Sequence, residues 1–477
     1  MSPEIHESLK AAYEDVAYVG RPNPWSHPGR LAAIATLFGL ALPDSGGARV
    51  LEVGCGDGAN LLPMAARMPG ATFTGCDASA LLMRRANDMA RGLGLANVEF
   101  VEGDLREVAG SLGTFDYVIA HGFYSWVPAD VRDAFLALAH GHLAPGGLVY
   151  VSYNVLPGCF VRQIGWDAIK LENAGAATAR ERLEGARRVR RDLAEAWRAA
   201  GGMAAMLAAE LADDAGRTDG ALYHDDMSGV NQPVYFTAFA RHAAAHGLGF
   251  LAEAELGTMG AGGLPPDMQK IIVDADPMAR EQYIDFARLR RFRQSILAAA
   301  PDVQRARLTP AALERLHVSA VTGVVQERVA TGGRPGGDLL VDVLAEHYPG
   351  TIAGAELVDA LVARGVPANE AAGLILRGCF AGACELHQNP LPAMPGASER
   401  PRAFAVARWQ VARSEIVTNL RHEGVHLHEE DARRLLAAAD GTRDRAGLAA
   451  ALGSRPDAAA FADQCLDRFA LTGLLES

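Results

Sequence analysis

The strongest chemical signal in this chain of 477 residues is a glycine-rich turn that joins a buried apolar run to a helix, Val-Leu-Glu-Val-Gly-Cys-Gly-Asp-Gly-Ala-Asn-Leu at 50–61. Gly54, Gly56 and Gly58 allow the backbone to approach a ligand closely and to adopt positive φ. The start of the following helix offers unpaired N–H donors to an anion. Because Gly54, Gly56 and Ala59 also satisfy the GxGxxG/A dinucleotide pattern, the turn alone predicts a nucleotide-like ligand without choosing its class.

Three acidic side chains near successive strand ends favour S-adenosylmethionine over NAD as that ligand. Asp77 ends the second predicted strand, where a carboxylate accepts hydrogen bonds from both ribose hydroxyls of either ligand. Asp104 and the Leu105 N–H, after the third strand, are placed to hold an adenine ring. Glu52, inside the first strand, adds a carboxylate that favours an ammonium or sulfonium and repels a pyrophosphate. We therefore expect S-adenosylmethionine as cofactor and S-adenosylhomocysteine as product.

The elements that must position these residues follow a strand–helix alternation from residue 31 to about 155. Short apolar runs separated by amphipathic helical stretches lie at 48–53, 71–76, 98–102, 117–120 and 148–153. This pattern predicts a parallel sheet with crossover helices, whose ligands lie at the carboxyl ends of the strands. Two later runs, 249–256 and 295–299, are expected to return to the sheet. We predict an α/β fold: a seven-stranded Rossmann-like sheet with a helical insertion and a mostly helical, winged-helix-like C-terminal region.

Motifs outside the glycine-rich turn carry a family resemblance. They are Ala-His-Gly-Phe-Tyr-Ser-Trp-Val-Pro at 120–128, Ser-Tyr-Asn-Val-Leu-Pro-Gly at 152–158, Asn-Gln-Pro-Val-Tyr-Phe at 231–236, Arg-Arg-Phe-Arg-Gln at 290–294, Thr-Asn-Leu-Arg-His-Glu at 418–423 and Asp-Gly-Thr-Arg-Asp-Arg at 440–445. Over 45–155 the chain resembles the class I S-adenosylmethionine-dependent methyltransferases. Over most of its length it resembles bacterial methyltransferases that carry a methyltransferase regulatory domain, which are similar to bacterial protein-lysine methyltransferases. The resemblance implies a protein lysine as the methyl acceptor. Cys159 stands where the family usually has an aromatic residue.

Five segments are predicted along the chain. They are a cofactor-binding methyltransferase domain (1–158), a helical insertion (159–245), a regulatory-type segment that returns two strands to the sheet (246–300), a winged-helix-like domain (301–400) and a C-terminal helical domain (401–477). The winged helix is suggested by a helix-helix-helix-strand order at 339–388. Because that stretch has no surplus of basic residues, we expect it to contact protein or to be structural.

Side chains just beyond the fourth and fifth strands are expected to face the methyl acceptor, because acceptors meet the cofactor there in this fold. We predict His121, Tyr124, Tyr153 and Asn154 as catalytic, and Tyr13, Tyr18, Trp126, Tyr223 and Tyr235 as walls of the substrate pocket. On the cofactor side, Ala78 and His121 join the glycines and acidic residues above. A lysine acceptor must first lose a proton, since its unperturbed pKa is about 10.4. A dry, aromatic-lined pocket lowers that pKa and favours the charged methyl centre.

Composition excludes several other classes of protein. The formal net charge is -12, so we expect neither nucleic-acid binding nor membrane insertion. Six cysteines without a paired framework and the lack of a secretion signal at 1–10 predict a reducing, cytoplasmic location. His422, His426 and His428 lack the spacing of metal ligands, so no metal site is expected. The charge-alternating helix at 180–198 is a candidate surface for pairing two chains into a homodimer.

Two other functions stay open on the sequence. A small-molecule O- or N-methyltransferase requires a closed pocket and no extended groove for a peptide. An S-adenosylmethionine-binding interaction protein without turnover requires only the cofactor residues. Glu52, Asp77 and Asp104 predict cofactor binding in all three cases, so they do not separate an enzyme from a sensor.

Overall fold

The computed structural model describes residues 16, 20–42, 44–212, 218–330, 338–394, 396–453 and 455–476. Its centre is a seven-stranded sheet in the order β3-β2-β1-β4-β5-β7-β6. The strands are β1 (Arg49–Val53), β2 (Thr72–Asp77), β3 (Val98–Glu102), β4 (Phe115–Ala120), β5 (Leu143–Asn154), β6 (Leu248–Glu253) and β7 (Phe292–Ala299). β1 to β5 are parallel, whereas β7 runs antiparallel to both of its neighbours, β5 and β6. The predicted fold class, with two late strands returning to the sheet, is confirmed.

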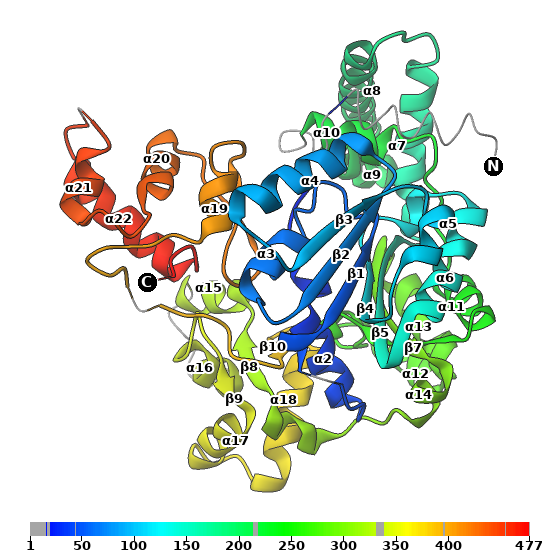
Figure 1. Cartoon of the computed structure of the whole chain (residues 1–477). Helices are drawn as coiled ribbons and strands as arrows, with labels where there is room; N and C mark the ends of the chain where they lie inside the picture. Colours follow the sequence, from blue (N-terminus) through cyan, green and yellow to red (C-terminus); the bar gives the residue numbers. More distant parts are fainter. Residues whose placement is uncertain are drawn as a thin grey trace.

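Helices cover both faces of the sheet (Figure 1). Alternate side chains of β4 enter two cores, Tyr117 and Ile119 on one face and Val118 and Ala120 on the other. The first face carries α2 (Pro28–Leu37), α3 (Leu61–Arg67) and α4 (Ala80–Leu93), and the second carries α5 (Leu105–Val108), α6 (Ala129–His142) and α11 (Phe236–Ala245). Because both faces are covered, the central strands are apolar along their length, which is why they read as continuous apolar runs in the sequence.

A helical segment after β5 lies beside the carboxyl ends of the strands. It consists of α7 (Cys159–Glu172), α8 (Ala179–Ala200), α9 (Gly202–Ala212), α10 (Asp219–Ala221) and the π-helical turn η5 (Leu222–Asp226). A capping box between Thr178 and Glu181 starts α8. Buried Arg190 on α8 donates to Asp226 (2.8 Å), which also accepts from Trp166 Nε1 on α7 (3.0 Å). These contacts tie η5 to the two long helices.

The rest of the chain forms two smaller units beyond α12 (Pro266–Asp274), α13 (Pro277–Arg288) and β7. The first unit comprises α14 (Ala300–Arg305), β8 (His317–Ala320), α15 (Thr322–Ala330), α16 (Leu339–Ala345), β9 (Ile352–Ala353), α17 (Gly354–Ala363), α18 (Ala368–Phe380) and β10 (Cys384–His387). Its three strands pair in the order β10-β8-β9. Its core is continuous with the first face of the large sheet, so it is not a separate body.

The last unit has a core of its own and rests against α3 and α4. It comprises α19 (Ala405–Gln410), β11 (Ile416–Thr418), β12 (Gly424–His426), α20 (Glu430–Ala438), α21 (Arg445–Ala450) and α22 (Ala458–Leu471). The sequence described 401–477 as helical, and the hairpin β11–β12 corrects that description. Its strands have three residues each, too few to show an alternating pattern.

Among the helices of the described ranges, none combines the length and apolarity needed to cross a bilayer.

Candidate functional site

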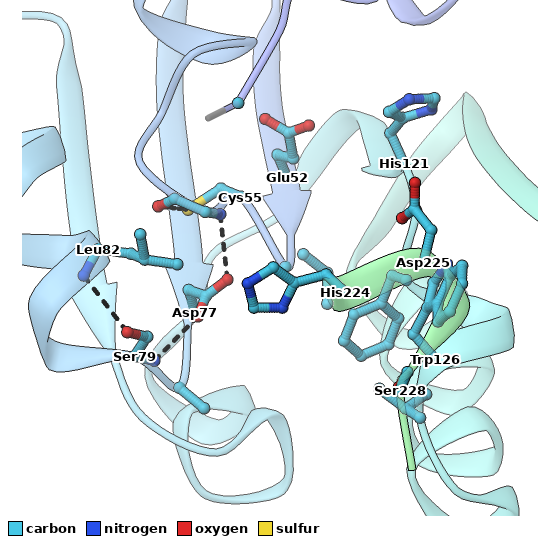
Figure 2. A pocket seen from close by; sticks show the side chains of 18 of the residues that line it. Glu52, Cys55, Asp77, Ser79, Leu82, His121, Trp126, His224, Asp225 and Ser228 are labelled. Carbon is cyan, nitrogen blue, oxygen red and sulfur yellow. Dashed lines mark hydrogen bonds between the residues drawn. The ribbon is translucent and has the colours of Figure 1, made fainter. Parts of the chain in front are cut away.

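A cavity of about 980 Å³ lies at the carboxyl ends of the parallel strands. The ends of β1, β2 and β4 form its sheet side, and α7 with the segment 223–229 forms the opposite side. Figure 2 shows Glu52 and Asp77 on the sheet side, with His224 and Ser228 on the facing segment. The volume is at the upper end of the roughly 300–1,000 Å³ of small-molecule sites, which leaves room for a nucleotide-like ligand and a second reactant.

The glycine-rich turn after β1 closes one end of this cavity. Gly54, Gly56 and Gly58 have φ values of 70°, 56° and 76°, in the left-handed region that favours glycine. A Cβ on Gly54 would lie 2.7 Å from the Phe123 ring, and one on Gly58 would lie 2.8 Å from the Phe100 ring. A Cβ on Gly56 would meet no atom of the described residues within 4 Å. Gly54 and Gly56 line the cavity, whereas Gly58 shapes the turn behind it.

Glu52 presents a buried carboxylate to the same cavity. Its Oε1 accepts a hydrogen bond from Asn60 Nδ2 (2.9 Å), while its Oε2 is buried and has no hydrogen-bond partner among the described residues. Burial raises the pKa of Glu52 to about 8. An orphaned carboxylate oxygen on a cavity wall fits a cationic ligand group, because such a group would satisfy both its charge and its lone pairs. The residues present therefore fit S-adenosylmethionine, which carries an ammonium and a sulfonium.

We expect the binding of S-adenosylmethionine to release a proton from Glu52. Below its pKa of about 8 the ligand-free side chain is mostly protonated at neutral pH, and a nearby cation stabilises the carboxylate. Since that pKa lies above the ordinary 4.5, the ligand-free protein also loses stability as the pH rises through about 8. Calorimetric titration at neutral pH in buffers of different ionisation enthalpy measures the release. We expect close to one proton for the wild type and none for Glu52→Gln; equal release by both proteins would contradict the placement of the cation.

The other two predicted acidic residues also lie on the cavity wall. Asp77 accepts hydrogen bonds from the N–H groups of Ser79 (2.9 Å) and Gly56 (3.0 Å), so it fixes the glycine-rich turn against β2. Asp104 caps α5 and accepts from Arg106 through the backbone N–H (2.9 Å) and the guanidinium (2.6 Å). Ala78 and Leu105 line the cavity beside them. The contact of Asp104 with adenine stays a prediction; its carboxylate can accept a further hydrogen bond beside those from Arg106.

His121, directly after β4, lines the cavity as a neutral ring. Asn23 Nδ2 donates to His121 Nδ1 (2.9 Å) and to Tyr150 Oη (2.7 Å), and the Tyr150 hydroxyl donates to Gln294 Oε1 (2.6 Å). The Asn23 amide is oriented by the Trp25 N–H, which donates to its Oδ1 (3.3 Å). His121 Nδ1 is therefore an acceptor and the ring proton lies on Nε2. Burial lowers the pKa of His121 to about 4, so the ring is suited to donate a hydrogen bond at neutral pH.

The predicted acceptor-side residues divide into three groups. Asn154, Trp126 and Tyr223 line the cavity. Tyr13 and Tyr18 lie outside the described residues. Tyr124, Tyr153 and Tyr235 do not line the cavity, so their contact with the acceptor stays a prediction that this cavity does not support.

Tyr124 and Tyr153 belong to the core between the sheet and the helices of its second face. Tyr235 lies at the edge of that core. Tyr153 stacks on Phe239 with ring centroids 4.0 Å apart, and its hydroxyl lies 3.0 Å from Ser295 Oγ. Tyr124 packs edge-on against the same Phe239 ring. Tyr235 precedes α11 and packs against Phe286. These rings pack against residues of α11 and α13 and do not line the cavity.

Several residues of the site carry no strong sequence signal. Asn23 and Asn60 orient His121 and Glu52, and Gln294 completes the network around Asn23. Asn23 precedes Pro-Trp-Ser in an N-cap pattern that is visible in the sequence. Its contact with Gln294, 271 residues later, has no local signal.

His422 connects the last unit of the chain to the cofactor side of the cavity. It lies buried in the β11–β12 turn with a φ of 63°. Asn60 Oδ1 accepts from the Asn23 N–H (2.9 Å) and from His422 Nε2 (2.8 Å), so the Asn60 Nδ2 faces Glu52. The C-terminal unit thus helps to set the rotamer of the residue that holds Glu52.

We expect His422→Ala to weaken S-adenosylmethionine binding by about 3- to 10-fold, the value of about one hydrogen bond. The variant loses one of the two donors to Asn60 Oδ1 and keeps the Asn23 N–H, so the Asn60 amide that donates to Glu52 is held less firmly. Calorimetric titration measures the affinity. His426→Ala, an exposed change on the same hairpin, is the matched control and should bind like the wild type. Unchanged affinity in His422→Ala would show that the last unit does not support the cofactor side.

Three family models match the chain. They are described as methyltransferase domain (residues 50–147), predicted methyltransferase regulatory domain (218–298) and PKMT, C-terminal winged helix domain (399–461). The winged-helix match lies in the last unit, whereas the sequence placed its winged-helix-like domain at 301–400. The regulatory match begins inside the predicted helical insertion. The division into five segments remains a prediction.

Proteins of Rickettsia are similar to much of the chain. An uncharacterized protein of Rickettsia prowazekii is 34% identical over 287 residues, which cover 60% of this chain and 52% of the relative. A second one is 30% identical over 180 residues, covering 38% of this chain and 72% of the relative. The chain thus spans about half the length of the first relative. The solved structure of PKMT2 from Rickettsia typhi in complex with AdoHcy matches with a TM-score of 0.82 at 20% identity, covering 96% of this chain and 99% of that one, so the two share the fold.

Proposed function

The chain belongs to the class I S-adenosylmethionine-dependent methyltransferases that carry a methyltransferase regulatory domain, and from this membership we propose that it methylates lysine side chains of a protein substrate. S-adenosylmethionine is the methyl donor of this family. The match to the PKMT winged-helix domain supports a protein as the acceptor. The TM-score of 0.82 with PKMT2 supports the same overall architecture.

The aromatic lining of the cavity carries the proposal. Trp126, Trp166 and Tyr223 line it together with Phe123 and Phe292, and these rings come from four separate segments of the chain. Ring faces attract a methylammonium centre. An apolar wall also lowers the pKa of a lysine amine, which must be neutral to react. The aromatic lining therefore suits the acceptor and the carboxylate-bearing sheet side suits the cofactor.

When bound, S-adenosylmethionine supplies a methyl group on a positively charged sulfur. Glu52 balances positive charge beside it, and Asp77 accepts hydrogen bonds from ribose hydroxyls. On the acceptor side, the Asn154 side chain is held by Asn231 Oδ1 (3.0 Å) and the neutral His121 ring is held by Asn23. These groups orient the lysine nitrogen for in-line attack, for which positioning and exclusion of water supply most of the acceleration. The lysine proton leaves to solvent before the transfer.

The test is the transfer of labelled methyl from S-adenosylmethionine into a lysate of the source cells by the purified full chain. The products are separated into protein and small-molecule fractions, and labelled protein is mapped by mass spectrometry. We expect label on lysine side chains of protein. Asp77→Ala serves as the matched negative control, since it should lose the label with the cofactor.

Two results would overturn the lysine assignment. Label confined to the small-molecule fraction would make the chain an O- or N-methyltransferase of a metabolite. Clear binding of the cofactor without transfer of label to any product would make the chain a cofactor-binding interaction protein.

Pairing of two chains through 159–245 and a cytoplasmic location remain proposals. Sedimentation of the purified protein would test the pairing, and fractionation of the source cells would test the location.

A further inference from the structure

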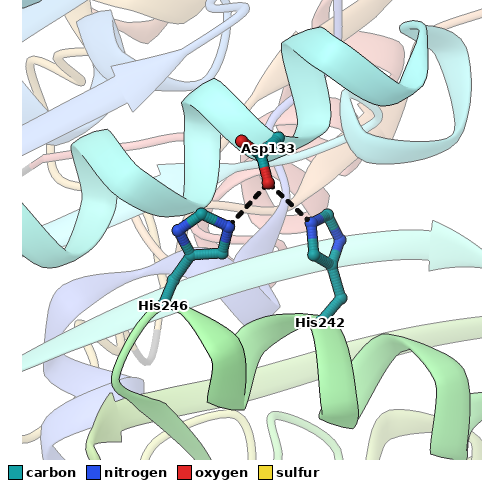
Figure 3. A group of neighbouring side chains, drawn as sticks. All are labelled: Asp133, His242 and His246. Atoms are coloured by element: carbon teal, nitrogen blue, oxygen red, sulfur yellow. Dashed lines mark hydrogen bonds and ion pairs between the residues drawn. The ribbon is translucent and has the colours of Figure 1, made fainter.

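A second group of polar side chains lies outside the cavity, between α6 and α11 (Figure 3). Asp133 on α6 faces His242 on α11 and His246, the C-cap residue that directly follows α11. Asp133 Oδ1 lies 2.9 Å from His246 Nε2 and 3.4 Å from His242 Nε2. One ligand atom from each of the three side chains lies within 4.8 Å of the other two. All three point toward one common point between the helices.

This arrangement has the composition and spacing of a metal site. Ligand atoms of a tetrahedral Zn²⁺ bound at about 2.0–2.1 Å lie about 3.3 Å apart, close to both distances from Asp133. Two imidazoles and one carboxylate suit borderline divalent ions such as Zn²⁺, Co²⁺ and Ni²⁺. We propose that Asp133, His242 and His246 bind one divalent transition-metal ion, with the remaining coordination positions left to water. The Asp133 side chain is 65% exposed, so solvent reaches the site.

An outer contact supports the role of His242 as a ligand. The Tyr124 hydroxyl lies 2.8 Å from His242 Nδ1, the ring nitrogen that does not face Asp133. In the metal-bound form Nδ1–H donates to Tyr124, which leaves the Nε2 lone pair for the ion, as in most histidine-ligated metal sites. Tyr124 is itself 2% exposed and is fixed by Phe239 and by the Arg132 guanidinium 4.9 Å from its ring centre. The ligand is therefore held in place before the ion binds.

The ion would join two parts of the chain. α6 lies in the segment matched as methyltransferase domain, and α11 lies in the segment matched as regulatory domain. Tyr124 belongs to η4 (Tyr124–Trp126), which also carries the cavity-lining Trp126. Metal binding would thus stabilise the contact between the two domains and one wall of the cavity. The sequence predicted no metal site because His242 and His246 are 109 and 113 residues from Asp133.

The test titrates metal-free full-length protein with Co²⁺ and then with Zn²⁺, using the visible absorption of Co²⁺ and calorimetry. We expect one equivalent of Co²⁺ to bind with an absorption of four- or five-coordinate geometry, and Zn²⁺ to displace it and raise the Tm. Asp133→Asn, at an exposed position, and His246→Ala should each weaken binding at least 10-fold. Tyr124→Phe should weaken it several-fold with unchanged stoichiometry. The Tm of each metal-free variant checks that it is folded.

The matched control is a second surface histidine pair, His426 and His428, whose ring centroids lie 5.4 Å apart and which has Glu415 3.8 Å from His428 Nδ1. His426→Ala with His428→Ala should leave binding unchanged. The proposal would be overturned if the wild type bound no stoichiometric ion at micromolar concentrations. It would equally be overturned if Asp133→Asn and His246→Ala bound like the wild type, or if binding were lost with the control pair. The cluster would then be only a hydrogen-bonded contact between two helices.

Discussion

Replacing Asp77 by alanine is expected to weaken S-adenosylmethionine binding about 100-fold, or about 2.7 kcal/mol, while the ligand-free protein stays folded. The Asp77 carboxylate ends β2 on the cavity wall. The alanine variant would lose two charge-assisted hydrogen bonds to the ribose hydroxyls of the cofactor. Each of these bonds is worth about 1.5–3 kcal/mol before the cost of desolvation. Burial raises the pKa of Asp77 despite hydrogen bonds from the Ser79 and Gly56 N–H groups. The variant loses these two hydrogen bonds, but it also removes a charge that burial disfavours, so the Tm should fall only modestly.

Calorimetric titration and the Tm shift caused by the cofactor measure the loss. Asp116→Asn is the matched control, because Asp116 lies near the start of β4, at the opposite end of the sheet, and pairs with Arg49 (2.9 Å). It should lower the stability slightly and leave the affinity unchanged. Asp77→Asn keeps the shape without the charge and should give an intermediate affinity. Wild-type affinity in Asp77→Ala would remove this residue from the cofactor site.

The cofactor side of the cavity could be predicted from the sequence because its signals are local. A glycine-rich turn follows β1 directly, and Asp77 follows from the end of the next strand. The carboxyl ends of parallel strands meet at one edge, so residues at those ends converge whatever the rest of the chain does. The apolar runs are also local signals, and they predicted the order of the elements and the return of β6 and β7 to the sheet.

The acceptor side could be predicted only in part. Tyr153 and Asn154 are neighbours at the end of β5, and adjacent side chains of a strand point to opposite faces. Only one of them can reach the cavity, and the structure shows that it is Asn154. The sequence pattern of aromatic residues does not reveal which face α11 covers, and that packing decides the position of Tyr153.

Contacts between distant segments left no signal in the sequence. His422 reaches Asn60 across 362 residues, and Asn23 reaches Gln294 across 271. Each of these side chains is of a type that is common at surfaces and caps. Their roles emerge only when the last unit packs on α3 and α4 and when β7 joins β5.

Arg293→Met is expected to destabilise the protein by about 3–5 kcal/mol, a large part of the roughly 5–15 kcal/mol typical of a folded protein. The Arg293 side chain is fully buried on β7. Its guanidinium donates to Asp285 (2.8 Å), Glu253 (2.7 Å) and Glu281 (3.1 Å). Methionine fills much of the same volume but removes the guanidinium that pairs with three core carboxylates, one of which, Asp285, keeps an ion pair with Arg290. Urea-induced unfolding measures the loss, and a midpoint equal to that of the wild type would contradict this view of the cluster.

Glu281→Gln is the companion variant that separates the charge from the packing. Burial raises the pKa of Glu281 to about 7, above its ordinary value of 4.5, so the wild type loses stability as the pH rises through about 7. The amide does not titrate, and its Tm relative to the wild type should therefore increase between about pH 6 and about pH 8. A Tm difference that stayed constant over that range would contradict the raised pKa, because a Glu281 ionised throughout would not titrate there. Because Phe292 and Gln294 flank Arg293 on β7, the same cluster also holds the cavity edge and the His121 network in place.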